Sequence, residues 1–120
     1  MSRNAVVYRV EHQHTGKGPW THSWGLFGCH NGHTPGDLPC PQEDGIGYPA
    51  SFEVCATASV RKLKTWFHDP HLKELHDAGF VVRRYRAPAK AVRRGKHQVL
   101  IDSRQWVKVG EKSPLHYVGA

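Results

Sequence analysis

The residues best suited to hold a metal ion lie close together in the first third of the chain. The segment Cys29-His30-Asn31-Gly32-His33 is followed by Cys40, so thiol and imidazole groups recur within a short stretch. Zinc takes four such ligands in a tetrahedron, with Cys deprotonated and His neutral. The candidate zinc ligands are Cys29, His33 and Cys40, with His22, His30 or Cys55 as the fourth. Their spacing differs from standard Cys-x2-Cys pairs, and the alternative is a His-rich loop around unliganded thiols.

A second candidate site is a run of basic residues in the last third of the chain. No Asp or Glu occurs between Ala78 and Ile101. The residues of this run that we expect to contact a partner are Arg83, Arg84, Tyr85, Arg86, Arg93, Arg94 and Lys96. Such cations neutralise phosphates and give salt-sensitive binding with little sequence preference, and a tyrosine can stack on a base. The alternative is a solvated edge strand that its charge protects from aggregation.

A third candidate is the glycine-rich segment Gly16-Lys17-Gly18-Pro19-Trp20. Glycine lets the backbone approach a ligand closely, and Lys17 could reach a phosphate or a carboxylate. The spacing is neither that of a P-loop nor that of a Rossmann fingerprint, so a tight turn is the simpler interpretation. A pocket that rivals the basic run would be formed by Arg9, His12, Gly16, Gly18, Trp20 and Gln98.

Motifs of hydrolytic enzymes do not occur. The sequence contains no Gly-x-Ser-x-Gly and no His-Glu-x-x-His segment. The acidic pairs Glu43-Asp44 and Glu74 with Asp77 are better explained as surface or helix-end charges than as a catalytic dyad. The sequence therefore assigns no catalytic residue, and a binding protein is favoured over an enzyme.

A long irregular segment separates the first regular element from the rest. Residues 5 to 11 predict a strand, because they are rich in β-branched and aromatic residues. Residues 12 to 49 hold eight of the twelve Gly and five of the eight Pro, which predicts a loop. The loop also carries four aromatic residues, which disordered linkers rarely contain. We therefore expect it to be ordered and to face a ligand.

The remainder of the chain predicts regular structure. The expected elements are a strand over residues 51–56, helices over residues 59–67 and 70–78, and strands over residues 80–86, 97–102 and 105–109. Thr57 or Ser59 would cap the first helix, and Asp69 would cap the second, which would end at Gly79. This order indicates an α+β fold with an antiparallel or mixed sheet and two short helices on one face.

Composition limits the class of protein. A chain of 120 residues and 13.5 kDa forms one domain, spanning residues 1–120. Its formal net charge of +7 favours an acidic partner, either nucleic acid, a nucleotide or an acidic protein face. The absence of a long apolar run argues against a membrane segment, and three cysteines without a signal sequence predict a cytoplasmic protein with reduced thiols. Exposed edge strands would permit a homodimer.

Several short motifs together resemble a set of small uncharacterised proteins encoded by bacteriophages and prophages. The motifs are Tyr8-Arg9-Val10-Glu11-His12, Gly16-x-Gly18-Pro19, Leu63-x-x-Trp66-Phe67, Gly79-Phe80 and Gly95-x-x-Gln98-Val99. The resemblance spans nearly the whole chain. It implies a dispensable accessory protein that acts in the host cytoplasm on a host or defence component, and it brings no known catalytic residues with it.

A fainter resemblance is to ADP-ribosyltransferase-type domains. It implies that Arg9 or His12 occupies the first position of that family's site and that Ser51 or Ser59 occupies the second. Where the family has a glutamate, this chain has Gln98 or Asp102. The resemblance therefore implies nucleotide binding on a related fold more readily than group transfer, and fold analogy alone is associational.

These observations lead to one principal hypothesis and two alternatives. The principal hypothesis is a phage-type accessory protein without catalytic activity whose basic strand–loop surface engages an acidic partner. That partner would be nucleic acid, a host protein or a phosphorylated small molecule. The alternatives are an ADP-ribosyltransferase-like nucleotide-binding domain or enzyme with a pocket near Arg9, His12 and Gln98, and a module stabilised by zinc.

Overall fold

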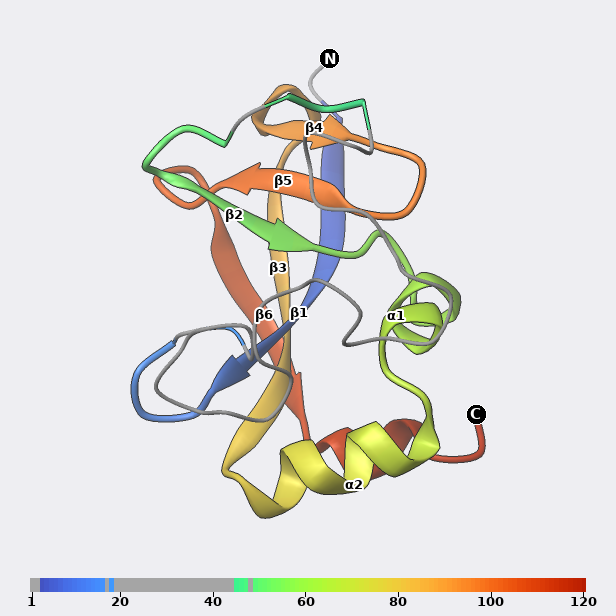
Figure 1. The fold of residues 1–120 in the computed structure, drawn as a ribbon. Coiled ribbons are helices and arrows are strands. Elements are labelled where there is room, and N and C mark those ends of the chain that lie inside the picture. Colours follow the sequence, from blue (N-terminus) through green and yellow to red (C-terminus); the bar gives the residue numbers. More distant parts are fainter. Residues whose placement is uncertain (1–2, 17, 19–44, 48) are drawn as a thin grey trace.

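Two long strands form the centre of the computed structural model, which describes residues 3–16, 18, 45–47 and 49–120 (Figure 1). The strands β1 (Asn4–His12) and β3 (Phe80–Pro88) pair antiparallel along their whole length. The strand β6 (Val107–Lys112) pairs antiparallel with the other edge of β3, with an irregularity between Arg84 and Tyr85. The first sheet therefore has the order β1-β3-β6.

A second small sheet lies across one end of the first. It consists of β2 (Glu53–Ala56), β4 (Val92–Arg94) and β5 (Val99–Asp102), paired antiparallel in the order β2-β5-β4. The short 3-10 helix η1 (Ala89–Ala91) leads from β3 into β4. The two sheets are joined where Tyr8 and Thr57 exchange backbone hydrogen bonds of 2.8 Å in both directions.

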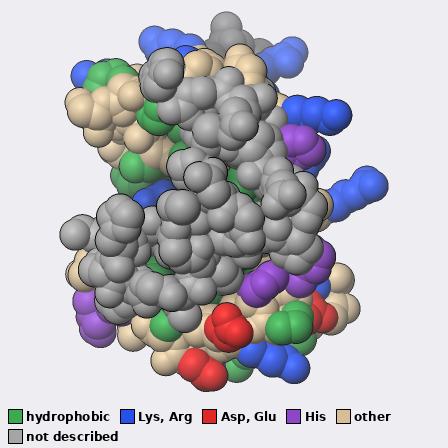
Figure 2. Space-filling model, in the orientation of Figure 1, with side chains coloured by type: hydrophobic (Ala, Val, Ile, Leu, Met, Phe, Trp, Pro, Cys, Tyr) green, Lys and Arg blue, Asp and Glu red, His purple; other side chains and the backbone are tan. Residues whose placement is uncertain are grey.

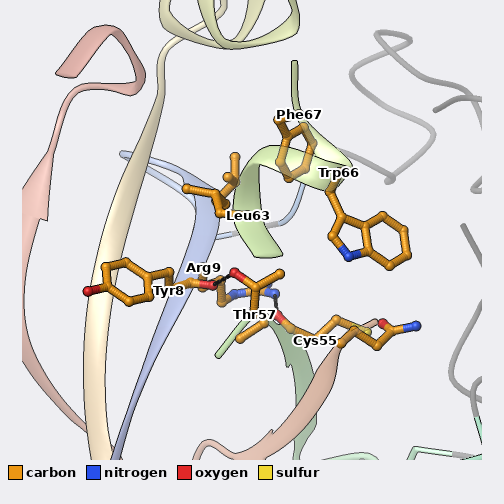
Figure 3. Close-up of a pocket in the computed structure, with 10 residues that line it drawn as sticks. Tyr8, Arg9, Cys55, Thr57, Leu63, Trp66 and Phe67 are labelled. Carbon is orange, nitrogen blue, oxygen red and sulfur yellow. Dashed lines mark hydrogen bonds between the residues drawn. The ribbon is translucent and has the colours of Figure 1, made fainter. Parts of the chain in front are cut away.

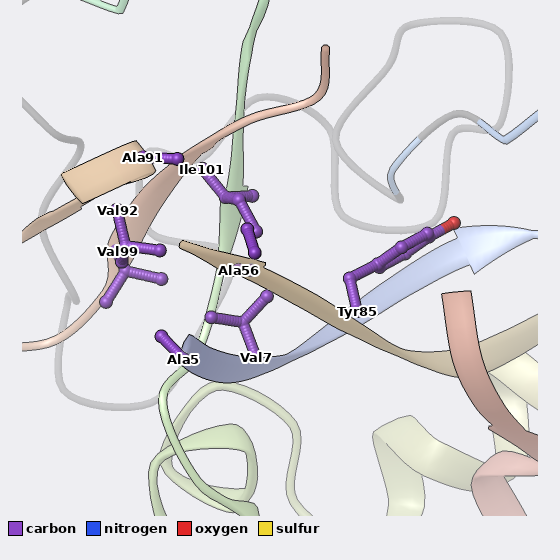
Figure 4. Close-up of a cluster of buried hydrophobic side chains, with 9 residues drawn as sticks. Ala5, Val7, Ala56, Tyr85, Ala91, Val92, Val99 and Ile101 are labelled. Atoms are coloured by element: carbon purple, nitrogen blue, oxygen red, sulfur yellow. The ribbon is translucent and has the colours of Figure 1, made fainter. Parts of the chain in front are cut away.

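Apolar side chains fill the space between the two sheets (Figure 4). The buried members of this cluster are Ala5, Val7, Ala56, Tyr85, Ala87, Ala91, Val92, Val99 and Ile101. The Tyr85 ring lies at one end, and its hydroxyl points away from the other labelled side chains in Figure 4. Burial of these apolar side chains is what holds the second sheet against the first.

Helices cover the opposite face of the first sheet at the other end of the molecule. They are α1 (Val60–Trp66), α2 (Asp69–Asp77) and the 3-10 helix η2 (Pro114–Tyr117). Their buried side chains pack with those of the sheet in a second cluster, made of Val10, Leu63, Trp66, Phe67, Leu72, Leu75, Phe80, Val82 and Tyr117. In the part of the chain that the structure describes, no helix is both long and apolar enough to cross a membrane.

The strand register divides the side chains of the first sheet into two sets. Residues directly opposite one another in an antiparallel pair share a face. The inner face, toward the second sheet, carries Ala5, Val7, Arg9, Glu11, Val81, Arg83, Tyr85, Ala87, Lys108 and Glu111. The outer face carries Val6, Tyr8, Val10, His12, Phe80, Val82, Arg84, Arg86, Val107, Gly110 and Lys112.

The predicted α+β class with two short helices is confirmed, but the strands form two sheets instead of one. The predicted helix over residues 70–78 begins one residue earlier, at Asp69, and its N-cap is His68. Asp69 does not cap because its carboxylate accepts hydrogen bonds from Lys64 Nζ at 2.7 Å and from the Gly119 backbone at 3.2 Å. Gly79 ends the helix with a φ of 88°, as predicted.

The strand boundaries differ most where local patterns are weak. The predicted strand over residues 105–109 lies at Val107–Lys112, because Gln105 and Trp106 belong to the turn that precedes it. Residues 92–94 were expected to belong to a loop over residues 90–96, but they form the strand β4, in which both arginines are exposed. Pairing with β5 makes them a strand. His12, predicted as the first residue of the long loop over residues 12–49, is the last residue of β1, and most of that predicted loop lies outside the described residues.

Candidate functional site

The strand part of the basic run is divided between the two faces of the first sheet. Arg83 lies on the inner face, where its guanidinium donates to Glu11 at 2.9 Å, to Glu111 at 2.7 Å and to the Gln13 carbonyl at 3.0 Å. Arg84 and Arg86 lie on the outer face, and neither has a side-chain hydrogen bond or ion pair among the described residues. Arg83 is therefore part of the scaffold, while Arg84 and Arg86 remain available to a partner.

Tyr85 is also part of the scaffold. It is buried, and its hydroxyl donates a hydrogen bond to Glu11. Its ring stacks on Trp106 with a centroid distance of 3.7 Å and an interplanar angle of 8°. With its ring covered in this way, Tyr85 offers no surface for stacking on a base.

The carboxylate of Glu11 organises the inner face. It is 2% exposed and receives hydrogen bonds from Arg9 Nε at 2.9 Å, from Arg83 and from Tyr85. Arg9 also donates to the carbonyls of Cys55 at 2.8 Å and Gly16 at 3.3 Å. A buried carboxylate is stable only when it is paired in this way. The alternation of Arg9 and Glu11 on one side of a predicted strand was the only sequence signal for this network.

Tyr85 gives the protein a predictable sensitivity to alkali. Burial and the hydrogen bond to Glu11 raise the pKa of Tyr85 from 10.0 to about 12. The unfolded chain therefore loses this proton first, so the contribution to stability is complete below pH 10 and is lost as the pH rises toward 12. Thermal melts across this range should show a steeper fall in Tm for the native chain than for Tyr85→Phe. Equal slopes for the two proteins would contradict this prediction.

In the hairpin formed by β4 and β5, one basic residue is likewise paired with a carboxylate and others have no described partner. Arg93 forms two hydrogen bonds with the Glu53 carboxylate, at 2.6 and 2.8 Å, and donates to the Ile46 carbonyl at 2.8 Å. The hydrogen bond from Arg93 holds the pKa of Glu53 below its usual value although burial opposes this. The side chains of Arg94 and Lys96 are exposed and have no partner among the described residues.

Arg94 and Lys96 line an open pocket of about 180 Å³ between the hairpin and α1, which we call the hairpin pocket. Its lining residues are Ala58, Lys62, Arg94, Gly95, Lys96, His97, Gln98 and Val99. Lys62 Nζ donates to the Lys96 carbonyl at 3.0 Å, and Trp66 Nε1 donates to the His97 carbonyl at 2.9 Å. These two bonds fix α1 against the hairpin. Sequence patterns had marked His97 as a residue that could stack on a base, but they did not single out Lys62, because the helix and the hairpin are distant in the chain.

The residues proposed for the rival pocket come together only in part. Arg9 and Gln98 both line a small cavity of about 20 Å³ between β1, β2 and α1 (Figure 3). Gly16 and Gly18 lie beside the Arg9 guanidinium. His12 lies on the outer face, where its ring packs edge-on against Phe80, and Trp20 lies outside the described residues. A cavity of this size holds about one water molecule, so no nucleotide fits between these side chains as they stand.

Comparison with known proteins identifies the family. Residues 1–115 match the family model described as the bacteriophage T4 Y00F protein. The chain belongs to this family. It matches no curated protein and no solved structure. The match confirms the resemblance to phage-encoded accessory proteins that the sequence motifs indicated.

In this Y00F-family protein, only Arg9 and Gln98 of the residues suggested by the ADP-ribosyltransferase resemblance line the same cavity among the described residues. Ser59 Oγ caps α1 by accepting the Lys62 N–H at 3.1 Å, and Ser51 is exposed. The Asp102 carboxylate accepts from Arg104 at 2.9 Å and from Gln105 at 2.8 Å. The hydrogen bond from Arg104 holds the pKa of Asp102 well below its usual range. Asp102 and Ser59 therefore have structural partners of their own.

The candidate zinc ligands Cys29, His33 and Cys40 lie outside the described residues, as do His22 and His30. Cys55, the other candidate fourth ligand, is half-buried on β2. Within the described ranges of the Y00F-family chain, no three His, Cys, Asp or Glu side chains are grouped so that they could hold a metal ion.

Proposed function

We propose that this phage accessory protein binds an acidic macromolecule through the hairpin pocket, in the host cytoplasm. The observation that carries the proposal is the composition of the pocket. Lys62, Arg94 and Lys96 line it together, and none of its lining residues is a carboxylate. The formal net charge of +7 also favours an anionic partner for the molecule as a whole.

The clustering of these cations has a physical cost that an anionic partner relieves. The clustered cations repel one another, and a bound anion would be attracted to all of them at once. The hydrogen bond from Lys62 Nζ to the Lys96 carbonyl holds one of the cations in place, so less side-chain freedom is lost on binding. Binding should therefore be electrostatic and strongly weakened by salt.

The visible charges are distributed in keeping with this proposal. In Figure 2, Lys and Arg side chains project along the right-hand margin of the upper part of the molecule, beside His side chains. The Asp and Glu side chains visible in that view gather at the lower end, where α2 lies. Arg83 and Arg93, which sequence analysis counted with the same surface, are not part of the proposal because carboxylates already pair with them.

The test compares two double variants that remove the same amount of charge. Arg94→Gln/Lys96→Gln alters the hairpin pocket, and Lys73→Gln/Lys108→Gln removes two cations elsewhere. Binding to labelled DNA, RNA and poly-glutamate is measured by fluorescence anisotropy over a range of salt concentrations. The pocket variant should bind about tenfold more weakly at low salt, and its slope of log K against log salt should fall by about 1 for each cation removed.

The control variant should keep its affinity and slope, and both variants should melt close to the native temperature, because exposed side chains are replaced. Equal losses in the two double variants would show that only total charge matters and would overturn the proposal. The absence of binding to every polyanion at low salt would overturn it as well. Poly-glutamate binding as tight as nucleic-acid binding would identify the partner as an acidic protein.

A further inference from the structure

The outer face of the first sheet differs in charge from the inner face. The described residues of the inner face include Glu11 and Glu111, each paired with Arg83. No Asp or Glu stands at any of the outer-face positions, which instead include Arg84, Arg86 and Lys112. Strand register therefore places every carboxylate of this sheet on one side, so the charged side chains on the other side are all cations.

The described helices and the second sheet cover only part of the outer face. The helices bury its lower part through Val10, Phe80 and Val82. The second sheet packs against the inner face and so does not reach the upper part of the outer face. There, Val6 is 42% exposed and Val107 is 54% exposed, on the two strands that flank β3.

Arg84 stands at the boundary between the covered and uncovered parts. Its Nε is buried and has no hydrogen-bond partner, and no described residue pairs with the rest of its guanidinium. Partial withdrawal of an unpaired cation from water is unfavourable. Buried polar groups in native proteins nearly always have partners, and a bound anion would supply the one that is missing here.

Gly110 creates the space that Arg84 occupies. The two residues are directly opposite in the β3–β6 register. A Cβ atom at position 110 would lie 2.6 Å from Arg84 Nε, which is far too close, so any other residue would displace the guanidinium. The absence of a side chain at this position thus keeps Arg84 in its half-buried place on the sheet.

Two further side chains extend the surface around Arg84. Arg86 is exposed on the same face two residues along β3. At the usual rise of a strand, its Cα atom lies about 7 Å from that of Arg84. Tyr8 is the register partner of Arg84 on β1, and its ring is half-buried. Two arginine side chains attached at this spacing can each reach a phosphate of the same nucleic-acid strand, and an adjacent aromatic ring is suited to stacking on a base.

We infer that Tyr8, Arg84 and Arg86 on the outer face bind a single nucleic-acid strand, with the two arginines on its phosphates. Open sheet faces that combine cations with an aromatic ring bind single strands in this way. An acidic peptide in extended form would instead be expected to add to the edge of a sheet, where backbone groups are unpaired. The inference goes beyond the proposed function, because it concerns a different surface and names its ligand.

The test measures binding of a fluorescein-labelled oligo-dT strand at low salt by anisotropy. Arg84→Gln and Arg86→Gln should each weaken binding by about five- to tenfold, as expected for loss of a charged phosphate contact. Gly110→Ala should weaken it to a similar degree without any change of charge, because the added Cβ displaces Arg84. Arg84→Lys should recover only part of the lost affinity, since Lys lacks the planar fork of Arg.

The charge-matched control is Lys73→Gln, whose affinity should stay close to that of the native protein. Native affinity in both Arg84→Gln and Arg86→Gln would overturn the inference, and so would equal competition by poly-glutamate and unlabelled oligo-dT. If only the hairpin-pocket variant loses affinity, the outer face is not the site and the proposed function stands. If only the outer-face variants lose affinity, the inference stands and the hairpin pocket is excluded.

Discussion

Replacement of Glu11 by Ala should lower the free energy of unfolding by about 3–5 kcal/mol, the usual cost of removing one partner from a buried ion pair. Glu11 is 2% exposed and is bonded by Arg9, Arg83 and Tyr85. Its removal takes one acceptor from each of two guanidinium groups, and it leaves the Tyr85 hydroxyl without its described acceptor in a region largely closed to water. The loss therefore includes the desolvation of the groups left behind as well as the lost bonds.

The measurement is equilibrium unfolding in urea, monitored by tryptophan fluorescence. Glu74→Ala is the matched control, because Glu74 is exposed on α2 and its side chain has no described partner. That control should stay within about 0.5 kcal/mol of the native chain. A loss below about 1 kcal/mol for Glu11→Ala would mean that water or another group readily replaces the carboxylate, and the proposed role of this network would be wrong.

Replacement of Phe80 by Ala should cost about 3–5 kcal/mol, as is typical when a buried aromatic side chain is truncated. Phe80 is 1% exposed and belongs to the cluster that joins the helices to the outer face of the first sheet. It also contacts the His12 ring edge-on at 5.4 Å between ring centroids. Truncation would leave a cavity at the start of β3 that the helices cannot close without moving.

The same unfolding experiment on Val107→Ala provides the comparison, since the Val107 side chain is 54% exposed. Its effect should remain within about 0.5 kcal/mol. If Phe80→Ala and Val107→Ala were equally mild, the helical layer would not depend on Phe80 for its attachment to the sheet.

The two proposed binding surfaces have one feature in common. Arginines that lie next to each other in the chain have opposite roles: Arg83 and Arg93 pair with carboxylates inside the protein, whereas Arg84 and Arg94 have no described partner. A count of positive charges in the run therefore overstates the number that can meet an acidic partner. It also means that charge reversal across the whole run would confuse loss of stability with loss of binding.

Local patterns were sufficient to place most elements. A run of β-branched and aromatic residues predicted the first strand, the spacing of Leu72 and Leu75 predicted a buried helix face, and Gly79 marked its end. The predicted element boundaries were wrong where a contact with a residue far away in the sequence sets them. Asp69 does not cap its helix because Lys64 and Gly119 hold it, and Val92–Arg94 is a strand only because β5 lies beside it.

The sequence alone determined the fold class, the phage family and the alternation that sends Arg83 and Tyr85 to one side and Arg84 and Arg86 to the other. That alternation is local, because successive residues of any strand point to opposite faces. Only the tertiary structure decided which side is covered and which arginines find a carboxylate. Arg83 and Glu11 are 72 residues apart and Arg93 and Glu53 are 40 apart, so their pairing depends on long-range strand register, which no local pattern contains.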